Sequence, residues 1–362
     1  MKALILAGGF GTRLRPLSCT RPKILFPIVN KPLLEWTFQN LAEYNIKEAV
    51  LAVNHHTEIF IKQSRIRRHG IKVFFSRDPA KKPLGTGGPI KNAEKLLDPH
   101  KTFLVLNGDI FAHINYQELL ESHERTDATA TIALHEVEDP SRYGVAEMTG
   151  ANRIRRFIEK PAPGEAPTNL INAGVYALNP RIMRHISRDK KISIENQVFP
   201  KLAEQGELYG HVFKDLWMDV GQLEDYLEIN KVLLDSSSQK RKAKPREHVK
   251  VQEPVAFDRG VLIEKRSTIG PYAVLGQNVY VGRNVRIRDS IILSGTAIDD
   301  FSSIHGAIIG ENVAIGKGVK IQKGCVLGDH VSLKDDIVLA ENVSICPGKE
   351  VSESIQKSGH VV

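Results

Sequence analysis

The chain has 362 residues, of which 41% are hydrophobic and 25% are charged, and its formal net charge at pH 7 is +8. This length predicts roughly two domains, and the composition is ordinary for a soluble globular protein. No apolar run reaches the roughly 18 residues of a membrane span, and the chain starts without a signal-peptide pattern, so we expect a cytoplasmic protein with no membrane contact. The positive charge suits anionic nucleotides as well as nucleic acid. Because no nucleic-acid-binding motif is present, we expect no nucleic-acid partner.

A short apolar stretch followed at once by glycines opens the chain. Ala3–Leu6 has the length of a buried strand, and the glycines end it in a loop. Glycine lets backbone amides approach an anion closely, and basic side chains bring positive charge to the same place, so we predict a phosphate-binding loop. A tight turn between a strand and a helix is the alternative, and the spacing is neither the dinucleotide fingerprint nor a Walker loop. The residues that indicate phosphate binding are Gly8, Gly9, Gly11, Arg13, Arg15 and Lys23.

Helical and extended patterns alternate after this loop. Asn30-Lys31-Pro32 offers a helix cap and an N1 proline, and apolar residues then recur at helical spacing. Such alternation predicts an α/β fold with a Rossmann-like, mostly parallel mixed sheet. The next ranges read, in order, as strand 49–53, helix 57–68, strand 73–75, helix 87–97 and strand 102–106.

A second glycine-rich loop, Pro83–Pro89, stands at the start of the helix expected at 87–97. Its glycines would let a planar base lie against the backbone. The alternative is a plain loop that begins a helix. The residues alone leave both interpretations open.

Two apolar stretches, far apart in the chain, each lead to an aspartate. Asn107-Gly108-Asp109 follows one strand, and Leu216–Gly221 contains Asp219. An aspartate just past the carboxyl end of a buried strand lies where open α/β sheets bind ligands, and carboxylates are the oxygen ligands that Mg²⁺ prefers. An aspartate that caps a turn is the ordinary alternative. Two carboxylates on one Mg²⁺ would suit phosphoryl or nucleotidyl transfer.

A helix and a polar segment follow these motifs. Gln222–Leu234 has acidic residues in its first turn and apolar residues at helical spacing, which predicts a helix that closes the first domain. The next residues are rich in serine, lysine and arginine, and we expect an exposed linker rather than a nucleic-acid-binding arm. The predicted boundaries are a catalytic domain at 1–235, a basic linker at 236–250 and a second domain at 251–362.

The second domain repeats itself with a period of six residues. Apolar residues recur at this spacing, with two steps of five, and glycine often follows them. This is the pattern of the hexapeptide β-helix repeat, and it predicts about five turns of three strands each. The positions are 257, 263, 269, 275, 281, 287, 293, 298, 304, 309, 315, 321, 327, 333, 339 and 345.

The run from Gly8 to Lys23, GGFGTRLRPLSCTRPK, resembles the signature loop of the sugar-1-phosphate nucleotidylyltransferases. Ser18 replaces the usual threonine and keeps its hydroxyl, while Ile24 and Phe26-Pro27 also depart from the common pattern. The second loop resembles the guanylyltransferase version. Further stretches resemble family motifs, and the last of them are closest to the mannose-1-phosphate guanylyltransferases: Asp139–Val145, Phe157–Pro161, Ile171–Tyr176, Ile194–Pro200 and Leu216–Gly221.

The resemblance implies roles for residues at matching positions. Arg13, Lys23 and Asp109 would be catalytic, and Asp109 with Asp219 would bind Mg²⁺. The implied sugar-phosphate site is Gly144, Glu159, Lys160 and Asn172. The implied nucleotide site is Leu6, Ala7, Gly8, Gly9, Gly11, Thr12, Arg13, Lys23, Gly85, Thr86 and Asp109.

The reaction implied by the resemblance is the conversion of GTP, or another nucleoside triphosphate, and a sugar 1-phosphate, most closely mannose 1-phosphate, to a nucleotide sugar and pyrophosphate. The alternatives are uridylyl or thymidylyl transfer to glucose 1-phosphate, and a non-catalytic regulatory subunit of the same fold. The resemblance also implies a left-handed β-helix. Its exposed faces and edges predict a homo-oligomer. A third alternative adds acetyl transfer at His305 or His330, although such a histidine is more often structural.

Overall fold

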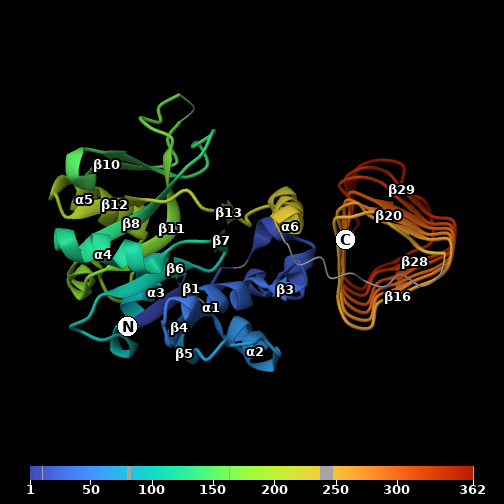
Figure 1. Ribbon diagram of the computed structural model, residues 1–362, viewed down its shortest axis with the longest axis horizontal. Coiled ribbons are helices and arrows are strands. Elements are labelled where there is room, and N and C mark those ends of the chain that lie inside the picture. Colours follow the sequence, from blue (N-terminus) through green and yellow to red (C-terminus); the bar gives the residue numbers. More distant parts are fainter. Residues whose placement is uncertain (10, 80–82, 163, 237–247, 362) are drawn as a thin grey trace. The chain divides into compact units, whose positions relative to one another are not determined.

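The computed structural model describes every residue except 10, 80–82, 163, 237–247 and 362 (Figure 1). The chain divides into two compact units. The first unit contains Met1–Gly9 and Leu33–Asp219, and the second contains Phe10–Pro32 and Val220–Val362. The segment around Arg13 and Lys23 therefore groups with the C-terminal half, whereas the sequence predicted it within the first domain. Most of the predicted linker, 236–250, lies outside the described residues.

The first unit is an α/β structure. Its helices and strands are, in chain order, β1 (Lys2–Leu6), α1 (Leu33–Glu43), β4 (Glu48–Val53), α2 (His55–Gln63), β5 (Lys72–Arg77), α3 (Gly87–Asn92), β6 (Phe103–Asn107), β7 (Ile110–Ala112), α4 (Tyr116–Thr126), β8 (Ala130–Glu136), β9 (Gly144–Met148), β10 (Ile154–Glu159), β11 (Leu170–Leu178), α5 (Phe199–Glu204), β12 (Leu208–Val212) and β13 (Trp217–Asp219).

A nine-stranded mixed sheet runs through this unit, with the order β10-β9-β11-β6-β1-β4-β5 and with β8 and β12 on a branch from β11. Strand β1 pairs in parallel with β4 and β6, and β5 continues the parallel set, whereas β11 pairs antiparallel to β6. The predicted mixed α/β sheet is confirmed. Because parallel strands end at one edge, the residues after β1 and after β6 lie close together.

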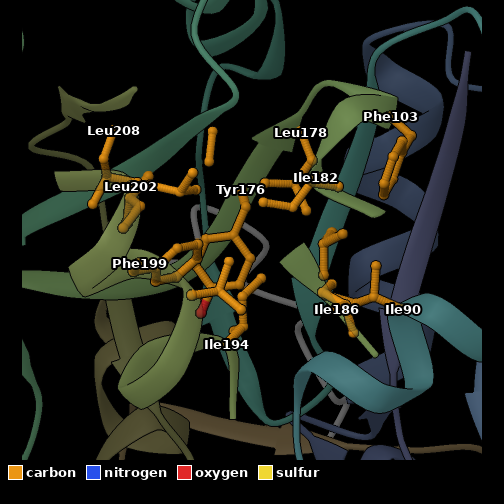
Figure 2. Packing of buried hydrophobic residues seen from close by; sticks show 14 of the residues in the cluster. Ile90, Phe103, Tyr176, Leu178, Ile182, Ile186, Ile194, Phe199, Leu202 and Leu208 are labelled. Carbon is orange, nitrogen blue, oxygen red and sulfur yellow. The ribbon is translucent and has the colours of Figure 1, made fainter. Parts of the chain in front are cut away.

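Large apolar side chains from strands and helices fill the core of the first unit (Figure 2). Tyr176 of β11 and Phe199 of α5 are fully buried, and their rings meet edge to face with centroids 5.1 Å apart. Burying one such ring stabilises the fold by about 1.5–3 kcal/mol. Burial also raises the pKa of Tyr176 well above its ordinary value, and Asn172 Nδ2 donates a hydrogen bond to its hydroxyl at 3.0 Å.

Three predicted helix boundaries were wrong. Asn30 has a left-handed backbone (φ 62°) and cannot cap a helix; it lies in a hairpin between β2 (Pro27–Ile28) and β3 (Lys31–Pro32), and α1 starts only at Leu33. Helix α2 ends at Gln63 instead of Arg68, because Ser64 is extended. Helix α3 ends at Asn92, and a 3₁₀ turn at Glu94–Leu96 follows it.

The second unit contains α6 (Leu223–Ser236) and a β-helix of short parallel strands from β14 (Lys250–Val251) to β32 (Gly359–Val361). The strands form two six-stranded sheets and one seven-stranded sheet, which confirms the predicted β-helix. It has more than the five turns expected, because the strands begin before position 257 and continue beyond 345. The predicted interior positions from Ile269 to Ile345 are buried. One position was displaced: Ile292 lies in the interior cluster opposite Leu275, rather than Leu293. Both residues are apolar, so the repeat alone could not separate them.

Candidate functional site

The glycines after β1 lie at the edge where the parallel strands end. Ala7 N donates to Ala52 O at 2.8 Å, and Gly108 N donates to Leu6 O at 2.9 Å. The second of these bonds places the residue before Asp109 directly against the end of β1. Leu6, Ala7, Gly8 and Gly9 and the predicted metal ligand Asp109 are therefore brought together within the first unit.

The two predicted metal ligands meet through a short sheet. Strands β7 and β13 pair antiparallel, with Asp219 opposite Ile110, the residue after Asp109. Directly opposed residues have Cα atoms about 4.5–5.5 Å apart, so the two carboxylates come from neighbouring backbone positions. Trp217 fixes β13 further, because its indole Nε1 donates to Ala173 O at 2.9 Å and its ring lies edge-on to Tyr143.

The side chains of Asn107, Asp109 and Asp219 offer oxygen atoms as metal ligands. Asn107 Oδ1, at the end of β6, is buried and has no hydrogen-bond partner among the described residues. Carboxylate and amide oxygens are hard donors, which suit Mg²⁺ better than a softer metal. Among the residues that the structure describes, no group of three or more His, Cys, Asp or Glu side chains is placed to hold a metal ion. Mg²⁺ is usually bound by one or two carboxylates together with waters and substrate phosphates, and Asp109 and Asp219 would supply the two carboxylates.

The second glycine-rich loop packs closely on residues 190–195. Gly85 has φ 72°, and a Cβ there would lie 2.3 Å from Ile192 O. Gly87 N donates to Ile192 O at 2.8 Å, and Thr86 Oγ1 donates to Glu195 Oε2 at 2.5 Å. These contacts alone require glycine at 85, which agrees with the plain-loop alternative. Contact of Gly85 and Thr86 with a nucleotide stays a prediction.

The carboxylate of Asp78 lies beside Gly8 of the glycine loop. It was not among the residues predicted from the sequence. A Cβ on Gly8 would lie 3.2 Å from Asp78 Oδ2, and Asn92 Nδ2 donates to Asp78 Oδ1 at 3.3 Å. Burial raises the pKa of Asp78 to about 6. Because it follows β5 at the same edge as Gly8 and Asp109, its position after a strand was the only available signal.

The predicted sugar-phosphate residues lie on β9, β10 and β11. Gly144 pairs with Glu159, and a Cβ on Gly144 would lie 2.6 Å from Glu159 Oε2 and 2.5 Å from Phe157 Cζ. Glycine is thus required there by these two side chains. The pKa of the Glu159 carboxyl is raised, mainly because it is buried and also because the negative charge of Glu195 is near.

Lys160 and Asn172 complete this group. Lys160 is exposed, and its left-handed backbone (φ 51°) turns the chain directly after β10. Its N–H donates to Tyr143 O at 3.0 Å. Asn172 accepts from Gly174 N at 2.9 Å through Oδ1, which orients its amide. Sugar contacts at these residues stay predictions.

The remaining predicted residues belong to the second unit. Gly11 is left-handed (φ 58°), and Thr12 and Arg13 lie on the exposed 3₁₀ turn Thr12–Leu14. Lys23 begins another 3₁₀ turn, Lys23–Leu25. Ser18 Oγ donates to Gly11 O at 2.7 Å, so the hydroxyl that Ser18 keeps closes this segment on itself. No helix in the described part of the chain is long and apolar enough to cross a membrane.

Two protein families match nearly the whole chain. The family described as Nucleotidyl transferase matches residues 2–236, and the GMPPB C-terminal domain matches residues 251–361. The chain is 37% identical to the mannose-1-phosphate guanyltransferase of Yarrowia lipolytica over 99% of both chains. It is 35% identical to the mannose-1-phosphate guanylyltransferase catalytic subunit beta of Danio rerio over 98% of both chains.

Solved structures resemble about two thirds of the chain. HddC from Yersinia pseudotuberculosis, in a crystal structure complexed with GMP-PN, is 31% identical, with a TM-score of 0.54. The similarity covers 64% of this chain and 99% of that one. A Bacillus anthracis protein described as a glucose-1-phosphate thymidylyltransferase shares the fold at 21% identity and a TM-score of 0.57.

Proposed function

Since the chain belongs to the nucleotidyl transferase family, we propose that it converts mannose 1-phosphate and GTP to GDP-mannose and pyrophosphate. Relatives that match over almost their full length carry the name of this activity, in a yeast and in a fish. Their agreement favours guanylyl transfer over uridylyl or thymidylyl transfer. It also favours an enzyme over a regulatory subunit of the same fold.

The pairing of β7 with β13 is the observation that carries this proposal. It sets Asp219 opposite Ile110 and therefore beside Asp109, although the two aspartates are far apart in the sequence. The phosphates of GTP and the attacking phosphate are all negatively charged, so nucleotidyl transfer needs a cation among them, and a pair of carboxylates can hold that cation. An aspartate that only capped a turn would have no need of the second one.

Enzymes of this family use a divalent metal, and we assign Mg²⁺ to Asp109 and Asp219. When bound, the ion would offset the charge on the α-phosphate of GTP. Both residues are partly buried, so their carboxylates would attract a cation more strongly than they would in open water.

Basic side chains of the protein would bind and neutralise the remaining phosphate groups. A phosphate oxygen of mannose 1-phosphate attacks the α-phosphorus of GTP in line, and the bond to pyrophosphate breaks as the new P–O bond forms. Arg13 and Lys23 would neutralise the leaving pyrophosphate, and Lys160 would orient the attacking phosphate. No covalent enzyme intermediate is needed, so positioning and charge neutralisation account for the catalysis.

The other predicted contacts divide between the two substrates. The nucleotide would lie against Leu6, Ala7, Gly8, Gly9, Gly11, Thr12, Gly85 and Thr86. The mannosyl group would lie against Gly144, Glu159 and Asn172, where the carboxylate and the amide offer acceptors and a donor to sugar hydroxyls. We also propose that the protein acts in the cytoplasm and assembles as a homo-oligomer through its β-helix, whose flat sheets offer surfaces to a second copy.

A nucleotide panel tests the function. Purified protein is mixed with Mg²⁺, mannose 1-phosphate and GTP, ATP, UTP or dTTP, and pyrophosphate release is measured; glucose 1-phosphate replaces mannose 1-phosphate in a second set. We expect the highest kcat/KM with GTP and mannose 1-phosphate. A higher value for UTP or dTTP with glucose 1-phosphate would favour the alternative enzyme, and no release with any pair would contradict catalysis.

A further inference from the structure

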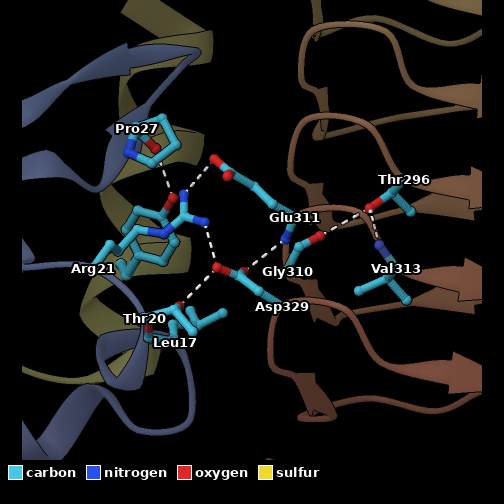
Figure 3. A network of polar contacts seen from close by, with 10 residues as sticks. Leu17, Thr20, Arg21, Pro27, Thr296, Gly310, Glu311, Val313 and Asp329 are labelled. Atoms are coloured by element: carbon cyan, nitrogen blue, oxygen red, sulfur yellow. Dashed lines mark hydrogen bonds and ion pairs between the residues drawn. The ribbon is translucent and has the colours of Figure 1, made fainter. Parts of the chain in front are cut away.

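An ion-pair network attaches the segment of residues 11–25, which carries Arg13 and Lys23, to the β-helix within the second unit (Figure 3). Arg21 Nη1 donates to Glu311 Oε1 at 2.5 Å, and Arg21 Nη2 donates to Asp329 Oδ2 at 2.6 Å. Thr20 Oγ1 donates to the same Asp329 oxygen at 2.7 Å. The side chain of Arg21 is only 11% exposed and that of Asp329 only 5%. Because Arg21 and Asp329 are both shielded from water, removing the charge of either one would leave the other charge buried without a partner, which is strongly destabilising.

The two carboxylate oxygens of Asp329 bind different parts of the chain. Its Oδ1 accepts from Glu311 N at 2.7 Å, a bond between neighbouring coils that recurs where Asp300 accepts from Arg283 N and Asp335 from Lys317 N. In Asp300 the second oxygen binds Arg283, which belongs to the β-helix itself. In Asp329 the second oxygen binds Thr20 and Arg21 instead. An aspartate at this position recurs in several coils, but only Asp329 among these three uses its second oxygen to bind residues outside the β-helix.

Further bonds hold the same segment from its other end. Tyr226 of α6 donates its hydroxyl to Pro27 O at 2.6 Å, Val29 N donates to Asn230 Oδ1 at 2.7 Å, and Asn30 Nδ2 donates to Leu275 O at 3.0 Å. Lys23 lies two residues beyond Arg21, between these two sets of contacts. Short 3₁₀ turns have poor hydrogen-bond geometry, so the segment depends on such contacts for its conformation.

We propose that Arg21 is a positioning residue, and that its ion pairs with Glu311 and Asp329 make the β-helix hold Arg13 and Lys23 in the conformation that binds the phosphates of GTP. This role rests on the proposed function, because it assigns the segment to GTP. The β-helix would then be required for nucleotide binding, and not only for assembly.

The test compares Asp329→Asn with Asp300→Asn. The asparagine at 329 keeps an oxygen for Glu311 N but loses the charge that binds Arg21. Asp300→Asn makes the same change at an equivalent coil without contacting the segment. Hydrogen–deuterium exchange of residues 11–25 and steady-state kinetics with each substrate are measured on the full-length variants.

We expect faster exchange at residues 11–25 in Asp329→Asn only, with the β-helix coils protected as in the parent. We also expect kcat/KM for GTP to fall about 10–100-fold, the range that misplacement of binding groups by about 1 Å produces. KM for mannose 1-phosphate should change less than KM for GTP. Asp329→Glu, which keeps the charge, should recover part of the loss.

Equal exchange at residues 11–25 in Asp329→Asn and Asp300→Asn would overturn the proposal. If Asp329→Asn does not fold, Glu311→Gln decides, because Glu311 binds Arg21 from the surface: faster exchange supports the proposal and unchanged exchange contradicts it. The exchange measurement needs no turnover, so it gives its answer even if the parent protein proves inactive with GTP.

Discussion

Single charged side chains carry the proposed chemistry, and only some of them stand out in the sequence. Asp109 and Asp219 each follow an apolar stretch, so their pattern and the family resemblance marked them. Nothing near Arg21 in the sequence marks it as paired, and its partners lie 290 and 308 residues further along the chain. No local pattern reveals such a pair. Asp78 follows the strand predicted at 73–75, but only the folded sheet brings it beside Gly8.

Arg13→Ala tests the cationic part of the mechanism. Arg13 is exposed and lies on a short 3₁₀ turn, so its loss should leave the fold intact. We expect kcat to fall roughly 10²–10³-fold, the effect of removing one preorganised charge-stabilising group. Arg68→Ala, which removes the same charge from another exposed arginine, is the control. Turnover of Arg13→Ala within tenfold of the parent would refute the role.

The ion pairs of Glu58 should make the stability of the first unit depend on pH. Its carboxylate binds Arg77 and Lys62, which together lower its pKa from 4.5 to about 2 despite burial. Because the folded value is depressed, the stability that these pairs contribute is present above about pH 4.5 and is lost as the pH falls toward 2.

Glu58→Gln should therefore lower Tm near neutral pH, and its difference from the parent should shrink as the pH falls from 4.5 to 2. Glu124→Gln, at an exposed position on α4, should have little effect at any pH. Thermal unfolding across this range checks the expectation. A Tm difference that stays constant down to pH 2 would contradict it.

Helices and strands were predicted well where one periodic pattern prevailed. The strand at 102–106 is observed as β6, one residue further along, and the positions of the six-residue repeat from Ile269 to Ile345 are all buried. Predictions were wrong where two local rules competed. Asn30-Lys31-Pro32 has the residues of a helix start, but Asn30 takes the left-handed backbone of a tight hairpin instead. Ile292 and Leu293 are both apolar, and only the register with Leu275 separates them.

A substitution in the second glycine-rich loop tests whether its contact with Ile192 requires glycine at position 85. In Gly85→Ala the new methyl would lie 2.3 Å from Ile192 O in a left-handed backbone, so both strain and overlap oppose it. We expect a loss of about 2–5 kcal/mol, from about 1–2 for the left-handed backbone and about 1–3 for overpacking. Gly70 is also left-handed (φ 82°) but has open space around it, so Gly70→Ala separates the two effects and should cost only about 1–2 kcal/mol.

Urea unfolding followed by tryptophan fluorescence reports this loss. Both tryptophans, Trp36 and Trp217, belong to the first unit, so the signal follows the unit that contains the loop. If Gly85→Ala unfolds at the same urea concentration as Gly70→Ala, the contact with Ile192 does not constrain residue 85.

The order of the parts along the whole chain was predicted correctly, with an α/β half followed by a β-helix. The structural grouping of residues 11–32 with the C-terminal half was not predicted, because the family motif runs without a break from β1 to Lys23. The contacts that produce this grouping join α6 and the β-helix to a segment near the other end of the sequence. Such pairings depend on the complete fold, and a single sequence carries no direct sign of them.

The dependence of GDP-mannose formation on Mg²⁺, followed by ³¹P NMR in the parent and in Asp219→Asn, tests the account most directly. The parent should form GDP-mannose and pyrophosphate in equal amounts from GTP and mannose 1-phosphate. Asp219→Asn should need at least about 10–100-fold more Mg²⁺ for half-maximal rate, because the loss of a residue that merely supports a metal ligand already costs that much. Asp215→Asn, an exposed aspartate four residues earlier in the chain, should match the parent. An identical Mg²⁺ dependence in Asp219→Asn, or no GDP-mannose from the parent, would contradict the account.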